Sequence, residues 1–275
     1  MLYMQYGADD LFKPLRSVAL CKPHYFDVIT PICSYQKPWV GKIDKAKAKQ
    51  QHKDLEKVLV NEGVSVHDLQ LIPGKTDQTF SRDIGYISSN GALLSSPKER
   101  IRQGEELSLL RLCYIEGIPI QNKHLPLPFE GGDVFPITPG EIVLGYGNRT
   151  HQFTVRQVGF RAISNLHLIR HRSTHHLDAV FNILEEDCVA AHRKLVDLNN
   201  SYFSGKKVLD LDDQDIEEMG ANFVLLKRGR VLADANCKFN EVLRKEGYDV
   251  VEVDVSELKK GGGSVRCLTL ELYRG

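Results

Sequence analysis

The stretch DIGYISSNGALL, residues 83–94, has the pattern of a β-hairpin. Two short apolar runs flank Asn90-Gly91, and Asn-Gly is a favoured two-residue turn because both of its positions adopt positive φ. Residues such as Tyr86 and Ile87 suit the arms of a hairpin. The stretch therefore predicts two antiparallel strands joined by a tight turn.

The same pattern recurs along the chain. Further hairpins are predicted over residues 133–144, 178–191 and 222–233. A fifth can form from the two ends, because residues 17–21 and 265–273 both have strand patterns and neither has a partner beside it in sequence. The five units begin about 45 residues apart, which is the sign of a repeated architecture.

Helical patterns lie between these units. Apolar residues at helical spacing predict helices over residues 43–62, 98–116 and 236–246, and residues 192–199 suggest a shorter one. Units that cannot bury their own faces satisfy their edges best by closing into a ring. We therefore predict a single α/β domain, residues 1–275, built as a five-bladed pseudosymmetric α/β propeller of ββαβ-type repeats. An open α/β sheet with coincidental spacing is the alternative.

The composition argues against nucleic-acid and membrane partners. Lys+Arg and Asp+Glu both number 36, so no net charge of one sign attracts a polyanion or an acidic lipid surface. Residues 1–12 are too acidic for a signal peptide, and no apolar run approaches the roughly 18 residues that span a bilayer. Six widely spaced cysteines with no Cys-x-x-Cys pair predict free thiols in a reducing cytoplasm.

A ring would bring the first residues of the five units together at its axis. The residues at those positions carry reactive or charged groups. They are Asp77 and Asp83, Glu130 and Asp133, His176 and Asp178, Asn222, and Cys267. A thiol, an imidazole and several carboxylates at one point are what nucleophilic thiol catalysis on a cation needs.

Four short sequence motifs, in their order along the chain, resemble those of the guanidine-modifying enzyme superfamily. They are TFSRD at 79–83, FEGGDV at 129–134, HLD at 176–178 and GGGSVRCLT at 261–269. The superfamily includes arginine deiminases, dimethylarginine dimethylaminohydrolases and amidinotransferases, and its fold is a five-bladed pseudosymmetric α/β propeller. The resemblance therefore implies the same fold that the repeat predicts independently.

The resemblance also implies roles for the converging residues. Cys267 would be the nucleophile, His176 the general acid and base, and Glu130 the partner of His176. Asp83 and Asp178 would hold the substrate guanidinium, whose parallel N–H groups suit carboxylates. Attack on the central carbon would give a covalent amidino intermediate, and water would release a urea such as citrulline. No cofactor and no metal is implied.

Further residues would bind the rest of the substrate. Arg149 matches a position that contacts the α-carboxylate in the hydrolases, and Arg102 is either a second contact or part of a solvated helix face. Asp77 and Phe80 match the family's Asp-x-x-Phe motif, in which Asp77 would either contact the α-amino group of the substrate or structure the loop. Residues 23–39, rich in Tyr, Phe and Pro, would form a flap over the ligand.

The sequence mixes features of several subfamilies. Arg82-Asp83 and Asp178 favour arginine deiminases and amidinotransferases, whereas the length and Asp77 favour dimethylarginine hydrolases. We predict a C–N hydrolase of an arginine-like guanidine, either arginine or a methylated arginine, with an amidinotransferase as the enzyme alternative. A non-catalytic binding protein on the same fold is the alternative from another class. The expected partner is a small guanidino molecule, and a homo-oligomer is left open.

Three histidines offer a different site. His167, His171 and His175 have i, i+4, i+8 spacing, which on a helix could place their imidazoles around zinc. We disfavour this interpretation because the sequence fixes no acidic partner nearby.

Overall fold

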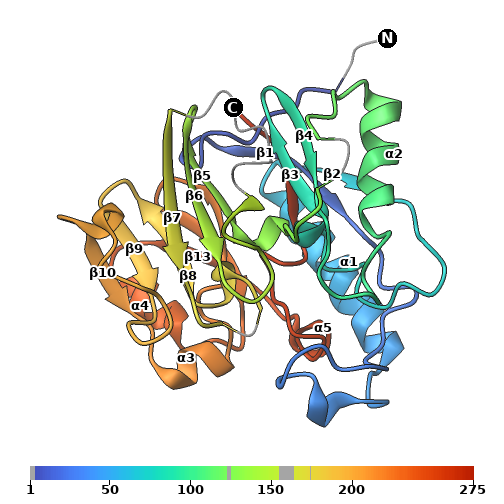
Figure 1. Cartoon of the computed structure of the whole chain (residues 1–275). Helices are drawn as coiled ribbons and strands as arrows, with labels where there is room; N and C mark the ends of the chain where they lie inside the picture. Colours follow the sequence, from blue (N-terminus) through green and yellow to red (C-terminus); the bar gives the residue numbers. More distant parts are fainter. Residues whose placement is uncertain (1–3, 123–124, 155–163, 174) are drawn as a thin grey trace.

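The structure is a computed structural model that describes residues 4–122, 125–154, 164–173 and 175–275. It contains five small sheets, one for each predicted unit (Figure 1). Four of them contain the predicted antiparallel hairpins. These are β3 (Gly85–Ser88) with β4 (Gly91–Leu94), β5 (Val134–Thr138) with β6 (Glu141–Tyr146), β8 (Phe181–Glu185) with β9 (Cys188–Ala191), and β11 (Val224–Lys227) with β12 (Arg230–Asp234).

A third strand joins the second strand of the hairpin in parallel in three of these sheets. The pairs are β7 (Asn165–Arg170) with β6, β10 (Lys207–Asp210) with β9, and β13 (Asp249–Val253) with β12. In the sheet of β3 and β4, an isolated parallel bridge between Ala92 and Ile120 takes this place. A parallel strand needs a crossover connection. Helices over residues 106–116 and 239–245 form this crossover in two of the repeats, which have the predicted ββαβ order, whereas the crossover from β9 to β10, which the structure describes in full, has no α-helix.

The two ends of the chain form the fifth sheet. β14 (Leu270–Arg274) pairs antiparallel with β1 (Leu15–Leu20), which pairs in parallel with β2 (Ser65–Asp68). The predicted pairing of the terminal strands is therefore confirmed. Because this sheet contains both ends of the chain, it closes the set of five into the predicted α/β propeller.

The main helices pack against the sheets. α1 (Lys45–Asn61) is capped by Asp44, whose carboxylate accepts hydrogen bonds from the N–H groups of Ala46 and Lys47. α2 (Glu106–Glu116) lies at one margin of the molecule in Figure 1 and ends at Gly117, which has a φ of 70°. The other helices are short. The α-helices among them are α3 (Asp213–Glu217), α4 (Phe239–Lys245) and α5 (Ser256–Lys259), and the 3-10 helices include η1 (Lys37–Trp39) and η6 (Ser201–Phe203).

Two helix predictions need correction. The helix predicted over residues 98–116 begins only at Glu106, because the residues before it form turns. The short helix predicted over residues 192–199 is wrong. Its backbone bonds to the end of β7 instead: Arg172 N–H donates to Leu195 O, and Asp197 N–H donates to Arg170 O. So short a segment has little helical stability of its own, and this pairing overrides it.

Three short 3-10 helices lead into the first strands of neighbouring sheets. They are η2 (Ser81–Ile84), η3 (Gly131–Asp133) and η5 (Leu177–Ala179), and η3 contacts both of the others. Buried apolar clusters fill the spaces between sheets, as where the rings of Phe135 and Phe181 meet edge to face at 5.1 Å. No helix in the described part of the chain is long and apolar enough to cross a membrane.

Candidate active site

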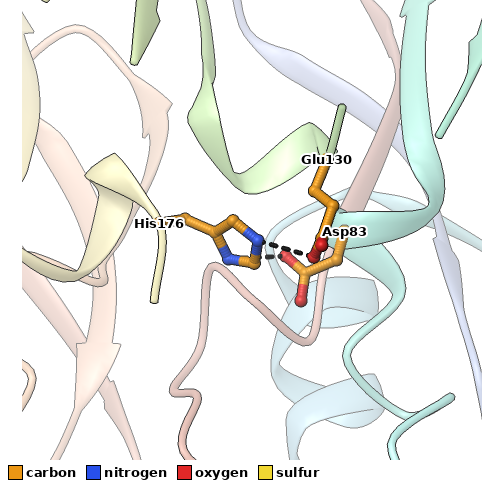
Figure 2. Close-up of side chains that lie close together, drawn as sticks. All are labelled: Asp83, Glu130 and His176. Atoms are coloured by element: carbon orange, nitrogen blue, oxygen red, sulfur yellow. Dashed lines mark hydrogen bonds and ion pairs between the residues drawn. The ribbon is translucent and has the colours of Figure 1, made fainter. Parts of the chain in front are cut away.

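His176 contacts two carboxylates, which lie on the same side of its ring in Figure 2. Its Nε2 is 2.8 Å from Oε2 of Glu130, and its Nδ1 is 3.3 Å from Oδ1 of Asp83. Glu130 and His176 immediately precede η3 and η5, while Asp83 belongs to η2. Because these short helices lie side by side at the starts of three repeats, the predicted convergence is confirmed for these side chains.

The charges of this group support one another. Burial opposes the charged form of His176, but Asp83 and Glu130 raise its pKa to about 9. Burial also opposes ionisation of Glu130, yet the hydrogen bond to His176 and the charges of His176, Arg149 and Arg102 lower its pKa to about 2. At neutral pH the pair is therefore an imidazolium and a carboxylate, with a proton on His176 available for donation.

Cys267 faces the carboxylate of Asp178. Its Sγ lies 3.9 Å from Oδ1 and 3.8 Å from Oδ2, and Nη1 of Arg266 binds Oδ2 at 2.9 Å. Burial raises the pKa of Cys267 well above its usual range, and the negative charges of Asp178 and Asp83 act in the same direction. The resting residue is therefore a neutral thiol, and a bound cation would favour its ionisation. All six cysteines are free, as predicted.

Two residues near Cys267 were given no role from the sequence. Nδ2 of Asn222 donates to Sγ of Cys267 at 3.1 Å. Arg266 is bound to Asp178, and its guanidinium lies 3.9 Å from the centre of the Phe135 ring. A signal did exist for Asn222, since it occupies a converging position in the fourth unit. Arg266 had none beyond lying beside Cys267.

The two arginines predicted to meet the substrate differ in their surroundings. Arg102 is buried and fully engaged, because its guanidinium binds Oδ2 of Asp83 at 2.5 Å and Oε2 of Glu105 at 2.8 Å. Arg149 is buried with Nη1 3.6 Å from Oε2 of Glu130, and among the described residues its Nε and Nη1 make no hydrogen bond. The alternative of a solvated helix face for Arg102 is wrong, because the side chain supports Asp83.

Asp77 and Phe80 lie in the loop that leads to η2. Burial raises the pKa of Asp77 to about 6, although Arg102 and Arg149 oppose this shift. The carbonyl of Asp77 accepts a hydrogen bond from the N–H of Phe80 at 3.0 Å, so the Asp-x-x-Phe motif forms a turn. A Cβ at Gly263 would lie 2.6 Å from the Phe80 ring, which explains why glycine is needed beside this ring.

The predicted flap segment, residues 23–39, packs on the same glycine loop. Nε2 of Gln36 donates to Gly261 O at 2.7 Å, and the ring of Phe26 meets that of Phe80 edge to face at 6.0 Å. The segment thus contacts the loop that carries Cys267. That this segment closes over a ligand stays a prediction.

One group of side chains could hold a metal ion in the described part of the chain. Ligand atoms of Asp83, Glu130 and His176 lie within 4.8 Å of one another. In this structure these carboxylates already have cationic partners, because Arg102 binds Asp83 and Arg149 lies 3.6 Å from Glu130.

The three histidines proposed for zinc are not on a helix. His167 lies in β7, where side chains four residues apart do not converge as they would on a helix. The sequence-based objection to zinc also needs correction, because acidic partners are present. Nε2 of His167 is 2.9 Å from Glu141, and Nε2 of His171 is 3.1 Å from Asp133.

Five small sheets in a ring, with a thiol, an imidazole and carboxylates where the repeats begin, form the pentein fold of the guanidine-modifying enzymes. Residues 23–274 match the family model described as N,N dimethylarginine dimethylhydrolase, eukaryotic. The chain belongs to this family.

Its relatives include both characterised and uncharacterised proteins. The chain is 31% identical over 271 residues to the uncharacterized protein YkgA of Bacillus subtilis, covering 96% of this chain and 94% of that one. It is 29% identical over 273 residues to N(G),N(G)-dimethylarginine dimethylaminohydrolase of Mycobacterium tuberculosis, covering 94% and 86%.

Solved structures share the fold. The N-terminal domain of ArgZ, a cyanobacterial arginine dihydrolase, bound to substrate superposes with a TM-score of 0.83 at 21% identity, covering 93% of this chain and 97% of that one. DDAH from Pseudomonas aeruginosa in complex with citrulline gives 0.79 at 22% identity, covering 94% and 99%.

Proposed function

We propose that this protein hydrolyses a C–N bond of an arginine-like guanidine through a covalent amidino adduct on Cys267. The citrulline-type product carries a ureido group, and the leaving group is ammonia or an amine. The observation that carries the proposal is the placement of the Cys267 thiol beside Asp178, with His176 in contact with both Asp83 and Glu130.

The carboxylates are disposed to bind a guanidinium. Asp178 binds Arg266 through Oδ2, and Asp83 binds Arg102 through Oδ2. Oδ1 of Asp83 is buried 3.3 Å from Nδ1 of His176 and makes no hydrogen bond within the described residues, so it can still accept from an incoming N–H group. Two carboxylates that accept from the terminal nitrogens would leave the central carbon open to Sγ.

Arg149 supports an amino-acid substrate. Its Nε and Nη1 are buried donors without hydrogen-bond partners among the described residues, although Glu130 balances part of its charge. A substrate carboxylate would satisfy these donors with a charge-assisted pair. This favours arginine over agmatine, which lacks the carboxylate.

The reaction follows from the protonation states. A substrate cation about 4 Å from Sγ would stabilise the thiolate by roughly 4 kcal/mol at an effective dielectric of 20, so the thiol releases its proton to solvent when substrate binds. Sulfur attacks the central carbon, and the imidazolium of His176 protonates the departing nitrogen as the C–N bond breaks. The neutral imidazole then takes a proton from water, which adds to the carbon and expels the thiolate.

The test is a product screen by mass spectrometry with arginine, methylarginines and agmatine, run with EDTA because the mechanism needs no metal. A ureido product with wild-type protein is expected from arginine or a methylated arginine. Added amines test amidinotransfer, since capture of the amidino group by an amine would replace the ureido product. If no substrate is consumed and a haloamidine leaves Cys267 unmodified, the protein is a binding protein.

Two variants test the roles in this mechanism. Cys267→Ser should lose turnover yet still bind substrate, because the clamp of Asp83 and Asp178 is intact. His176→Gly should retain an adduct of amidino mass when the substrate has a good leaving group, since no base activates water. Full turnover by Cys267→Ser would sink the mechanism.

A further inference from the structure

We propose that Asn222 is a positioning residue for Cys267, and that its side-chain amide orients the sulfur and stabilises the thiolate through the Nδ2–H donor. The effect of Asn222 on catalysis rests on the function proposed above, but the contact between Asn222 and Cys267 can be tested without turnover. Asn222 is buried, with 2% of its surface exposed.

The orientation of the amide is fixed by backbone partners. Oδ1 of Asn222 accepts from the backbone N–H of Ser264 at 3.2 Å and of Cys267 at 3.1 Å. Backbone N–H groups can only donate, so this side of the amide must be the oxygen. Nδ2 donates to the carbonyl of Asp178 at 3.1 Å, and its other hydrogen points to Sγ of Cys267 at 3.1 Å. Sulfur therefore acts as the acceptor, and this contact is stronger for a thiolate than for a thiol.

Asn222 also joins the two loops that carry the reacting groups. Its own carbonyl accepts from the N–H of Arg266 at 3.1 Å, next to the nucleophile. The same residue thus binds the glycine loop before Cys267 and the backbone of Asp178 on the opposite side. Such a residue sets the distance between the sulfur and the facing carboxylate.

The electrostatic surroundings make this donor important. The charged groups that face the sulfur are Asp178 of η5, Asp83 of η2 and Arg266, which neutralises part of the charge on Asp178. Burial and the two carboxylates raise the pKa of Cys267, whereas the hydrogen bond from Asn222 opposes them. In this group Asn222 is the side chain that donates to sulfur directly.

The experiment measures alkylation of Cys267 by iodoacetamide as a function of pH, with the modified Cys267 peptide quantified by mass spectrometry. Asn222→Asp keeps an acceptor for the two backbone N–H groups but replaces the donor to sulfur. We expect alkylation at pH 8 to slow at least about tenfold and its pH midpoint to rise by about one unit, since a hydrogen bond to a charged group is lost. Asn222→Ala should shift the midpoint in the same direction.

Asn240→Asp is the matched control. Asn240 is equally buried and its Nδ2 binds Asp234 O and Glu252, away from Cys267. This variant should change stability without moving the alkylation midpoint. An unchanged midpoint in folded Asn222→Asp or Asn222→Ala would overturn the proposal. So would failure of both to fold while Asn240→Asp folds, because Asn222 would then be needed for folding. A wild type with no guanidine turnover would contradict the proposed function and leave this test intact.

Discussion

At the scale of single residues, His176 should link the site to the stability of the whole chain. Although burial opposes its charge, Asp83 and Glu130 raise its pKa to about 9 from an ordinary value of 6.5. A group with a raised pKa in the folded state stabilises fully below its unfolded pKa and loses that contribution as pH rises through the folded pKa. We expect the free energy of unfolding to fall by about 3 kcal/mol between pH 6.5 and 9.

Urea unfolding at pH 6.5, 8 and 9 measures this, with His176→Gln as the comparison. The variant should lose most of the fall, because its side chain does not titrate. Cys267 does not share this window, since its raised pKa matters only above the ordinary value of 9.0. The same slope in both proteins would show that His176 is not charged in the folded state.

The reactive residues could be predicted because each lies at the start of a repeated unit. Glu130, His176 and Cys267 fall at such starts, and the structure brings Glu130 to His176 at 2.8 Å. The supporting contacts were not predictable. Arg266 reaches Asp178 across 88 residues of sequence, and no local pattern encodes such a pairing. The sequence left Arg102 open between a substrate contact and a solvated helix face, because its short-range pattern says nothing of its buried partner Asp83.

At the scale of elements, hairpin patterns predicted better than helical spacing. The hairpin of residues 83–94 forms as predicted, but its turn differs from the predicted one. Ser88 pairs with Gly91, so Ser89 and Asn90 form the loop, and of the predicted Asn-Gly pair only Gly91 has a positive φ, 121°. Residues 192–199 instead took the conformation that the end of β7 imposes. The histidines of residues 167–175 were open to a helical interpretation for the same reason, since spacing alone does not distinguish a helix from a strand and a loop.

The contact between the flap segment and the glycine loop gives a prediction at this scale. A Cβ at Gly261 would lie 2.5 Å from Cε2 of Phe26 and 2.8 Å from Cζ of Phe80. Gly261→Ala should therefore lower the free energy of unfolding by about 1–3 kcal/mol through overpacking. It should also raise KM for the substrate that the product screen identifies, because the flap is displaced from the loop of Cys267.

A double-mutant cycle with Phe26→Leu serves as the control. Leucine shortens the side chain that the new methyl group meets. The double variant should therefore lose less free energy of unfolding than the sum of the losses in the two single variants. The measurements are urea unfolding and initial rates over a range of substrate concentrations. Strict additivity would mean that Phe26 does not press on this loop.

At the scale of the whole molecule, closure of the ring depends on a buried charge cluster in the last strand. Nε of Arg274 binds Glu271 at 2.6 Å, while its other nitrogens donate to the carbonyls of Leu11, Lys13 and Leu225. Arg274 thus connects β14 to the N-terminal segment and to the neighbouring sheet through β11. Burial opposes the charge of Glu271, but Arg274 and Arg82 lower its pKa to about 2.

Arg274→Met should lower the free energy of unfolding by about 3–5 kcal/mol, because Glu271 would lose its hydrogen-bonded partner and keep Arg82 at 3.9 Å and the charge of Arg266. Arg16→Met is the control: Arg16 is exposed and donates to Gly275 O at 2.7 Å beside the same strand, so its loss should cost within about 0.5 kcal/mol.

Urea unfolding followed by far-UV circular dichroism and by the fluorescence of Trp39 measures both variants, and the two signals should change together if the ring unfolds as one unit. Glu271→Gln in the Arg274→Met background should recover part of the loss, since it removes the uncompensated charge. If Arg274→Met cost no more than Arg16→Met, closure of the ring would not depend on this cluster.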